Sequence, residues 1–313
     1  MNKNFCSLFI IAALAGCRCN NSNEVTSTNT SKDTLALVSP EPLTGNLKQY
    51  QQFLNKLDTA NAETATEAVV EYKRLFEKEN EAMRDAAYAL FDNYYERLDY
   101  GLNARMEQDT LDYMSLITYD AENGKQKPVS KELQAYEDRL ERNGFEVWSE
   151  EGMPYIRQGR GFVAKHFYGL VSTTMRQYLQ QVNKENKEGF SEDAGITILP
   201  QQHVDRLAWW DAFIAKNPGF ILADKAKQNR RHLLNWLVEG MDNTPLQMTE
   251  NNQLDEYHQD AYDYLQKAYP NSTSLKIIRP YFNALYAKDQ IKADAFLKEF
   301  RTKGFILNYG GDQ

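Results

Sequence analysis

Residues 210–218 read Trp-Asp-Ala-Phe-Ile-Ala-Lys-Asn-Pro, and residues 262–270 read Tyr-Asp-Tyr-Leu-Gln-Lys-Ala-Tyr-Pro. Each stretch places an aromatic residue, an aspartate and a large apolar residue on a predicted helix that a proline then stops. Apolar residues at helical spacing follow each stretch, over 226–237 and 277–285, and residues 294–297 echo the first half again. The pattern predicts helical hairpins. We expect their core positions to include Phe213, Leu234, Leu265 and Leu285.

Three further patterns precede these hairpins and predict an N-terminal helical group. Apolar residues recur at spacings of three and four over 47–57, 65–76 and 83–98. Thr64 and Glu67 fit a capping box before the second pattern, and Gly101 marks the expected end of the third. We therefore expect an N-terminal helical group over 47–127 and a helical body over 128–313.

The spacing of apolar residues changes between 145 and 157. Ser130 and Gly144 first fit the start and the end of a helix. Apolar and polar residues then alternate over 145–157 around a Glu-Gly pair, which predicts a β-hairpin whose Pro154 lacks an amide donor. Helical spacing returns over 162–182, before a polar loop at 183–193. The predicted fold class is mostly α, an irregular array of helical hairpins with one small β-hairpin.

The charge balance argues against one class of partner. The chain has 44 acidic and 36 basic residues, which gives a formal net charge of −8. Phosphate backbones and anionic membrane surfaces repel such a protein. We therefore expect no nucleic-acid partner and no broad electrostatic binding to a membrane.

The first seventeen residues have the layout of an export signal. Lys3 precedes an apolar run over 5–14, and the small residues Ala15 and Gly16 stand before Cys17. A transmembrane helix needs about twenty apolar residues, so this run is too short to anchor the chain as a helix. An ordinary secretory signal with a cysteine beside its cleavage site is the alternative.

Leu14-Ala15-Gly16-Cys17 resembles the lipobox of bacterial lipoproteins. The resemblance implies a signal peptide over 1–16, cleavage before Cys17 and lipid attachment to that cysteine, which would hold the protein on a membrane. Residues 17–46, rich in Ser, Thr and Asn, then form a flexible tether. No acidic run follows Cys17, which favours an outer-membrane position facing the periplasm. From Asn20 to Gln313 the chain has no cysteine, so we expect no disulfide.

Residues 201–304 resemble the tetratricopeptide-like helical pairs of envelope lipoproteins. The resemblance rests on the two repeated stretches and on Tyr269-Pro270-Asn271-Ser272, a typical joint between such helices. It implies stacked helical hairpins that present an extended surface to another envelope protein.

No motif predicts a metal or a cofactor. The four histidines lack the spacing that places two imidazoles on one helical face, and the acidic cluster 255–260 fits the start of a helix. Neither a Gly-x-Ser-x-Gly elbow nor a phosphate-binding loop occurs. Gly159-Arg160-Gly161 beside Arg157 can hold an anion, although it fits the end of the hairpin and the start of the next helix better. Paired carboxylates stay open because their pairing is spatial.

Trp209 and Trp210 are the candidate binding residues. Neighbours on a helix point about 100° apart, so one ring can join the core while the other lies at its margin and stacks on a sugar or anchors a peptide. Burial of both rings is the alternative. We interpret the chain as a non-catalytic binding or scaffold lipoprotein. The other interpretation, a glycan-binding or glycan-processing envelope lipoprotein, leaves enzymatic activity open.

Replacing Cys17 by alanine should leave the protein without lipid, because no other residue near the signal follows a Leu-Ala-Gly triplet. Metabolic labelling with an alkyne fatty acid measures this. Cys19→Ala is the matched control and should keep the label. Label retained by Cys17→Ala would contradict the lipobox interpretation.

Overall fold

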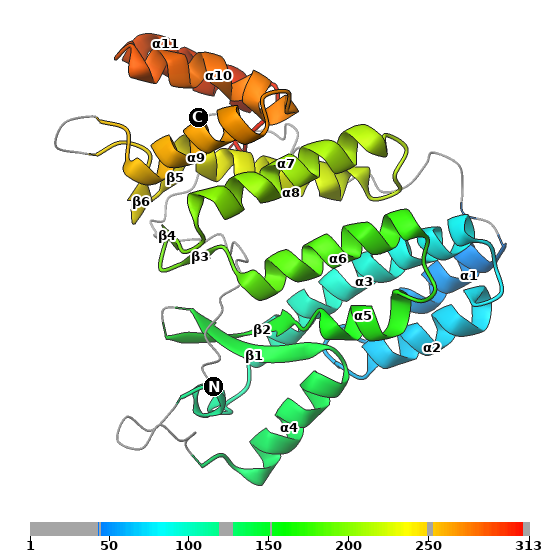
Figure 1. Ribbon diagram of the computed structural model, residues 1–313. Helices are drawn as coiled ribbons and strands as arrows, with labels where there is room; N and C mark the ends of the chain where they lie inside the picture. The colour runs from blue at the N-terminus through cyan, green and yellow to red at the C-terminus, as the bar shows by residue number, and fades with distance from the viewer. Residues whose placement is uncertain (1–42, 44, 119–127, 151, 249–252, 309–313) are drawn as a thin grey trace, which may run out of the picture.

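The computed structural model describes residues 43, 45–118, 128–150, 152–248 and 253–308. These residues form eleven α-helices, one short 3-10 helix and three two-stranded antiparallel sheets (Figure 1). The predicted fold class, mostly α with a small β-hairpin, is confirmed. The signal peptide and nearly all of the expected tether lie outside the described residues.

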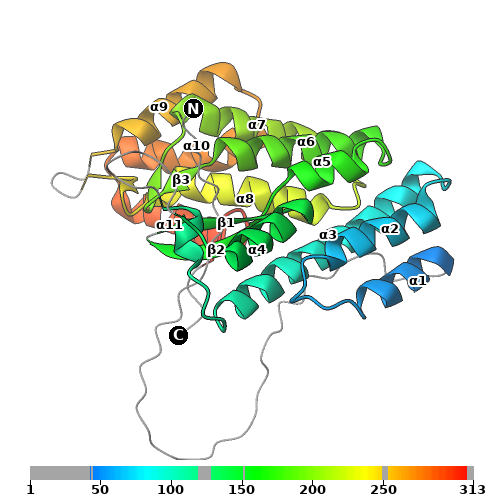
Figure 2. The ribbon, with the colours of Figure 1, turned by 90° about the horizontal axis from the view of Figure 1, so that it is seen from below.

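Three helices at the N-terminal side pack side by side (Figures 1 and 2). They are α1 (Gly45–Leu54), α2 (Thr64–Phe76) and the long α3 (Glu81–Met106). Tyr50 of α1 meets the rings of Tyr72 and Phe76 in α2, with centroids 6.1 and 5.5 Å away. Its hydroxyl donates to the carbonyl of Ala68 at 2.9 Å. The apolar stripes read from the sequence are thus the faces that join this group.

Two expectations for this group were wrong. Thr64 is the first residue of α2 and not its cap, because its hydroxyl donates to the carbonyl of Asn61 and accepts from Tyr94. Gly101 does not end α3, which continues to Met106. A Cβ at Gly101 would lie 2.1 Å from the carbonyl oxygen of Thr59. The glycine therefore serves a close approach between α3 and the loop before α2.

The β-hairpin lies where the alternation predicted it. Ser130 caps α4 (Lys131–Arg142) through the amide of Leu133 at 3.1 Å, and Gly144 turns the chain with φ +86°. Strands β1 (Phe145–Glu150) and β2 (Met153–Gln158) follow, and the 3-10 helix η1 (Tyr113–Leu116) packs against both. The Asn103 side chain of α3 donates to the carbonyl of Ile156 in β2 and accepts from its amide, both at 2.8 Å.

The segment expected to be one helix over 162–182 is two helices. These are α5 (Gly161–Phe167) and α6 (Thr173–Glu188), and the residue between them that caps α6 is Ser172. Asp85 of α3 accepts hydrogen bonds from the Ser172 amide at 2.8 Å and from its hydroxyl at 2.5 Å, which fixes the break. The loop expected at 183–193 is also wrong, since α6 continues to Glu188 and ends where Gly189 takes φ +70°.

The C-terminal part is mostly helical, but the expectation of helix after helix over 201–304 was wrong at 240–245, where a small two-stranded sheet interrupts the helices. Its elements in chain order are β3 (Ser191–Glu192), β4 (Gly195–Ile196), α7 (Pro200–Lys216), α8 (Ala223–Glu239), β5 (Gly240–Met241), β6 (Thr244–Pro245), α9 (Glu256–Ala268), α10 (Thr273–Tyr286) and α11 (Gln290–Thr302). Helix α7 packs on both α8 and α9, while α10 and α11 pair with each other.

The two repeated stretches are equivalent at their apolar positions and at their helix ends, where the amides of Asn217 and Tyr269 donate to the carbonyls of Phe213 and Leu265, but not at their aspartates. Trp210 and Tyr262 are both buried, as are Phe213 and Leu265. Asp211 is buried and accepts from the amide and the hydroxyl of Ser274 at the start of α10, whereas Asp263 is exposed. The expected core positions Leu234 and Leu285 are buried as well.

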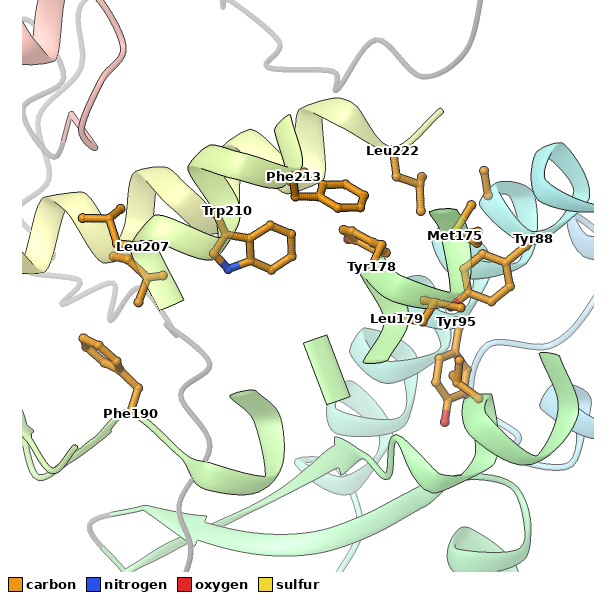
Figure 3. Close-up of a cluster of buried hydrophobic side chains, with 14 of the residues drawn as sticks. Tyr88, Tyr95, Met175, Tyr178, Leu179, Phe190, Leu207, Trp210, Phe213 and Leu222 are labelled. Carbon is orange, nitrogen blue, oxygen red and sulfur yellow. The ribbon is translucent and has the colours of Figure 1, made fainter. Parts of the chain in front are cut away.

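One continuous core joins the N-terminal and C-terminal helices. Tyr178 of α6 lies between them, with Met175 and Tyr88 on one side and Trp210 and Phe213 on the other (Figure 3). Its ring centroid is 5.7 Å from that of Trp210 and 6.2 Å from that of Phe213. Helix α6 is therefore held from both sides.

Gly101→Ala should destabilise the protein, although alanine favours a helix by about 1 kcal/mol over glycine. The added methyl overlaps a backbone carbonyl that cannot move aside freely, so we expect a net loss of about 1–3 kcal/mol in urea unfolding. Gly169→Ala is the control, because nothing lies within 4 Å of its added Cβ. Equal stability of the two variants would contradict the close approach at Gly101.

Candidate functional site

A pocket opens between α6 and α7, and we call it the Trp209 pocket. Its volume is about 430 Å³, and it is lined by Gln177, Gln180, Gln181 and Lys184 of α6 and by Trp209, Ala212, Phe213, Lys216 and Asn217 at α7 and its end. Both sets recur every three or four residues, so each comes from one face of its helix. The volume is that of a small-molecule site.

The two neighbouring tryptophans occupy different environments. Trp210 is fully buried, and its indole nitrogen donates to the Glu185 carboxylate at 2.8 Å. Trp209 is only partly buried and lines the pocket. The Trp209 ring stacks on Phe213 with centroids 5.0 Å apart and planes 11° apart. One ring thus belongs to the core, and the other is a fixed aromatic wall at its margin.

The rest of the pocket lining is rich in amides. Gln177 and Gln180 are exposed on α6, while Gln181 is buried and donates to Glu185 at 2.6 Å. Asn217 donates to the carbonyl of Phe213 at 2.8 Å. A primary amide carries both donors and an acceptor, so the exposed glutamines can pair with hydroxyl groups in either direction.

The charged side chains that line the pocket are all basic. Two of its lining residues are lysines and none is a carboxylate, although the whole chain carries a net charge of −8. The ammonium of Lys184 lies 3.9 Å from Glu188. The same carboxylate is bound more closely by Arg206, at 3.0 Å.

Glu185 does not line the pocket but contacts a side chain that does. Its carboxylate accepts from both Trp210 and Gln181, so it fixes one side chain of the core and one of the lining. Burial raises the pKa of Glu185 to about 7, against the opposing effects of the Gln181 hydrogen bond and of the Arg206 charge. Protonation of Glu185 is therefore easier in the folded chain than in the unfolded chain.

A second cluster of charges lies between α3 and α8. Asp92 accepts from Lys225 at 2.5 Å and has Arg160 at 3.9 Å, while Lys225 also reaches Glu96 at 2.7 Å. Burial opposes the charge on Asp92, but Lys225 and Arg160 hold its pKa below the usual value. Burial raises the pKa of Asp99 to about 7. The contacts of Lys225 with Asp92 and Glu96 tie the N-terminal helices to the C-terminal ones.

The anion site considered at Gly159-Arg160-Gly161 is not supported. The Arg160 side chain is 14% exposed and faces Asp92. Arg157 pairs with Glu146 at 2.9 Å and lies over the Trp148 ring at 3.7 Å. The glycines end the hairpin and begin α5, as the other interpretation predicted, and the amide of Gly159 donates to the carbonyl of Gly144 at 2.6 Å.

The most buried histidines are structural. His203 is bonded to the carbonyl of Leu233 at 2.8 Å, and burial lowers its pKa to about 3. His258 lies 3.1 and 3.2 Å from the carbonyls of Leu237 and Thr244. Asp255 caps α9, which agrees with the interpretation of 255–260 as a helix start. Within the described ranges, no group of three or more His, Cys, Asp and Glu side chains is placed to hold a metal ion.

Comparison of the chain with protein-family models, with curated proteins and with solved structures gave no match. The resemblances of 14–17 and of 201–304 therefore stay predictions. Among the residues that the structure describes, no helix has the length and apolar character needed to cross a membrane.

Glu185→Gln should change how stability depends on pH. The pKa of Glu185 is higher in the folded state, so wild-type protein is stabilised at low pH and loses that stability as pH rises through about 7. One pKa unit corresponds to about 1.4 kcal/mol, so we expect the variant to gain on the order of 1–3 kcal/mol relative to wild type between pH 5 and pH 8.

Chemical denaturation at a series of pH values measures this difference. Asp99 titrates in the same window in both proteins, so its effect cancels in the comparison. Glu192→Gln, at an exposed position in β3, is the control and should run parallel to wild type. A constant difference between Glu185→Gln and wild type would contradict the raised pKa.

Proposed function

We propose that this chain is a non-catalytic glycan-binding lipoprotein of the bacterial envelope and that its ligand binds in the Trp209 pocket. The observation that carries the proposal is the partly exposed Trp209 ring, held flat against Phe213 at the wall of a pocket. A fixed indole presents an apolar plane on which the face of a sugar ring can stack. Because Phe213 already orders the ring, binding loses little side-chain entropy.

The pocket lining favours glycan over a broad protein surface. Exposed glutamines beside the indole can bond to several hydroxyl groups of a sugar at once. The pocket volume of about 430 Å³ lies in the range of sites for small ligands, about 300–1,000 Å³.

The same lining favours binding over hydrolysis. Most glycoside hydrolases use two carboxyl groups, which flank the bond that breaks. The nine residues that line the pocket include none. Glu185, the nearby acid with a raised pKa, is engaged by Trp210 and Gln181.

A protein partner is the second candidate, as the sequence predicted for 201–304. The feature that favours it is a pair of exposed apolar side chains where α10 meets α11, Tyr286 at 47% and Ile291 at 87% exposure. Lipid on Cys17 would in either case concentrate the body at a membrane, where weak binding to a polymeric ligand is sufficient.

Trp209→Ala should lower the affinity for oligosaccharides about two- to tenfold, because a stacked ring contributes roughly 0.5–1.5 kcal/mol. Calorimetric titration measures this affinity. Neutral and acidic oligosaccharides are titrated into the full-length protein in detergent. Trp209→Phe keeps an aromatic ring and should keep part of the affinity. It shows whether the loss in Trp209→Ala comes from the missing ring or from misfolding. Trp148→Ala, in the hairpin, is the matched control and should bind as wild type does.

Two outcomes would contradict the proposal. One is that no oligosaccharide of the panel binds. The other is that Trp209→Ala and Trp148→Ala bind equally well. Loss of a captured protein partner on changing Tyr286 or Ile291, with oligosaccharide binding absent, would favour the second candidate.

A further inference from the structure

We propose that the Trp209 pocket selects saccharides that carry a negative charge, such as a carboxylate on the sugar ring. The inference rests on the proposed function, since it names the class of glycan that the same pocket binds. Its basis is the contrast between a lining with two lysines and no carboxylate and a chain with a net charge of −8.

The positions of the lysines follow from the pairing of the two helices. Glu185 of α6 meets Trp210 of α7, and Tyr178 of α6 meets Phe213 of α7, so the helices run in opposite directions. Lys184 therefore lies at the Trp209 end of the pocket, and Lys216 lies at the Gln177 end. A ring stacked on Trp209 would bring its carboxylate within reach of Lys184.

The charge of Lys184 is only weakly compensated within the protein. Its carboxylate neighbour Glu188 is 3.9 Å away and is bound more closely by Arg206. The Lys184 side chain is 61% exposed, so its ammonium can move to a ligand without breaking a short ion pair. The ammonium of lysine is a compact charge on a flexible stem, so it can follow a carboxylate to the position that the bound sugar gives it.

Lys216 also interacts with the end of its own helix, which reduces its expected contribution to the binding of a charged saccharide. It stands in the last turn of α7, where a positive charge offsets the negative end of the helix. Lys184 precedes the last turn of α6 and lies beside the indole, so it should dominate the recognition of charge.

The test compares charged saccharides with neutral partners of the same shape. Oligogalacturonates and their methyl esters are titrated into the full-length protein in detergent at pH 7. We expect the acids to bind about fivefold more tightly than the esters at low salt, the upper range for one exposed charge pair. Raising the salt concentration to about 0.5 M should remove most of the difference.

Substitutions of single lysines show which residue causes the preference for the acid over the ester. Lys184→Gln should remove most of the preference for the acid and leave the affinity for the ester unchanged, whereas Lys216→Gln should have a smaller effect. Lys187→Gln is the matched control, because Lys187 is exposed on α6 and does not line the pocket.

The outcomes separate this inference from the proposed function. Equal affinity for acid and ester, with binding still lost in Trp209→Ala, overturns the selection of charge and leaves glycan binding in place. Equal losses for acid and ester in Lys184→Gln also overturn it. Failure of both ligand series, and of every other saccharide in the panel, overturns the proposed function and this inference together.

Discussion

The arrangement of the molecule depends on the buried carboxylate of Asp92. A carboxylate in that position is costly unless cations pair with it, and removing one partner of such a pair costs about 3–5 kcal/mol. The cations are Lys225, from the first turn of α8, and Arg160, which precedes α5. The two contacts bring three distant parts of the chain together: α3, the residue before α5, and α8. The pairing of Asp92 with Lys225 and Arg160 thus holds α3, α8 and the start of α5 together.

Carboxylates also set helix starts at two other places. Asp85 of α3 binds the amide and the hydroxyl of Ser172 at the start of α6, and Asp211 of α7 binds the same two groups of Ser274 at the start of α10. The first turn of a helix has free amides and a partial positive charge, so an aspartate from a neighbouring helix is a favourable partner. Both contacts fix the direction in which a helix leaves the core.

Local patterns in the sequence predicted most helices and the hairpin, because apolar spacing and turn residues act over a few positions. Two of the errors occurred where a distant residue decided the structure. Asp85 splits the helix expected over 162–182, and Thr59 explains why Gly101 lies inside α3. For the pocket, the pair Trp209-Trp210 was a usable signal. The glutamines of α6 were not, since nothing local indicates that α6 packs beside α7.

The hydrogen bonds of Asn103 affect whether strand β2 of one copy of the protein can pair with a strand of another copy. Its side-chain amide forms hydrogen bonds with the backbone amide and carbonyl of Ile156, which point to the outer edge of β2. Pro154, two residues earlier, has the same orientation in the strand and offers no donor to that edge. An open strand edge is a template for pairing with other chains, and natural proteins protect such edges. If lipid concentrates many copies on one membrane, this edge is already closed to strand exchange and aggregation.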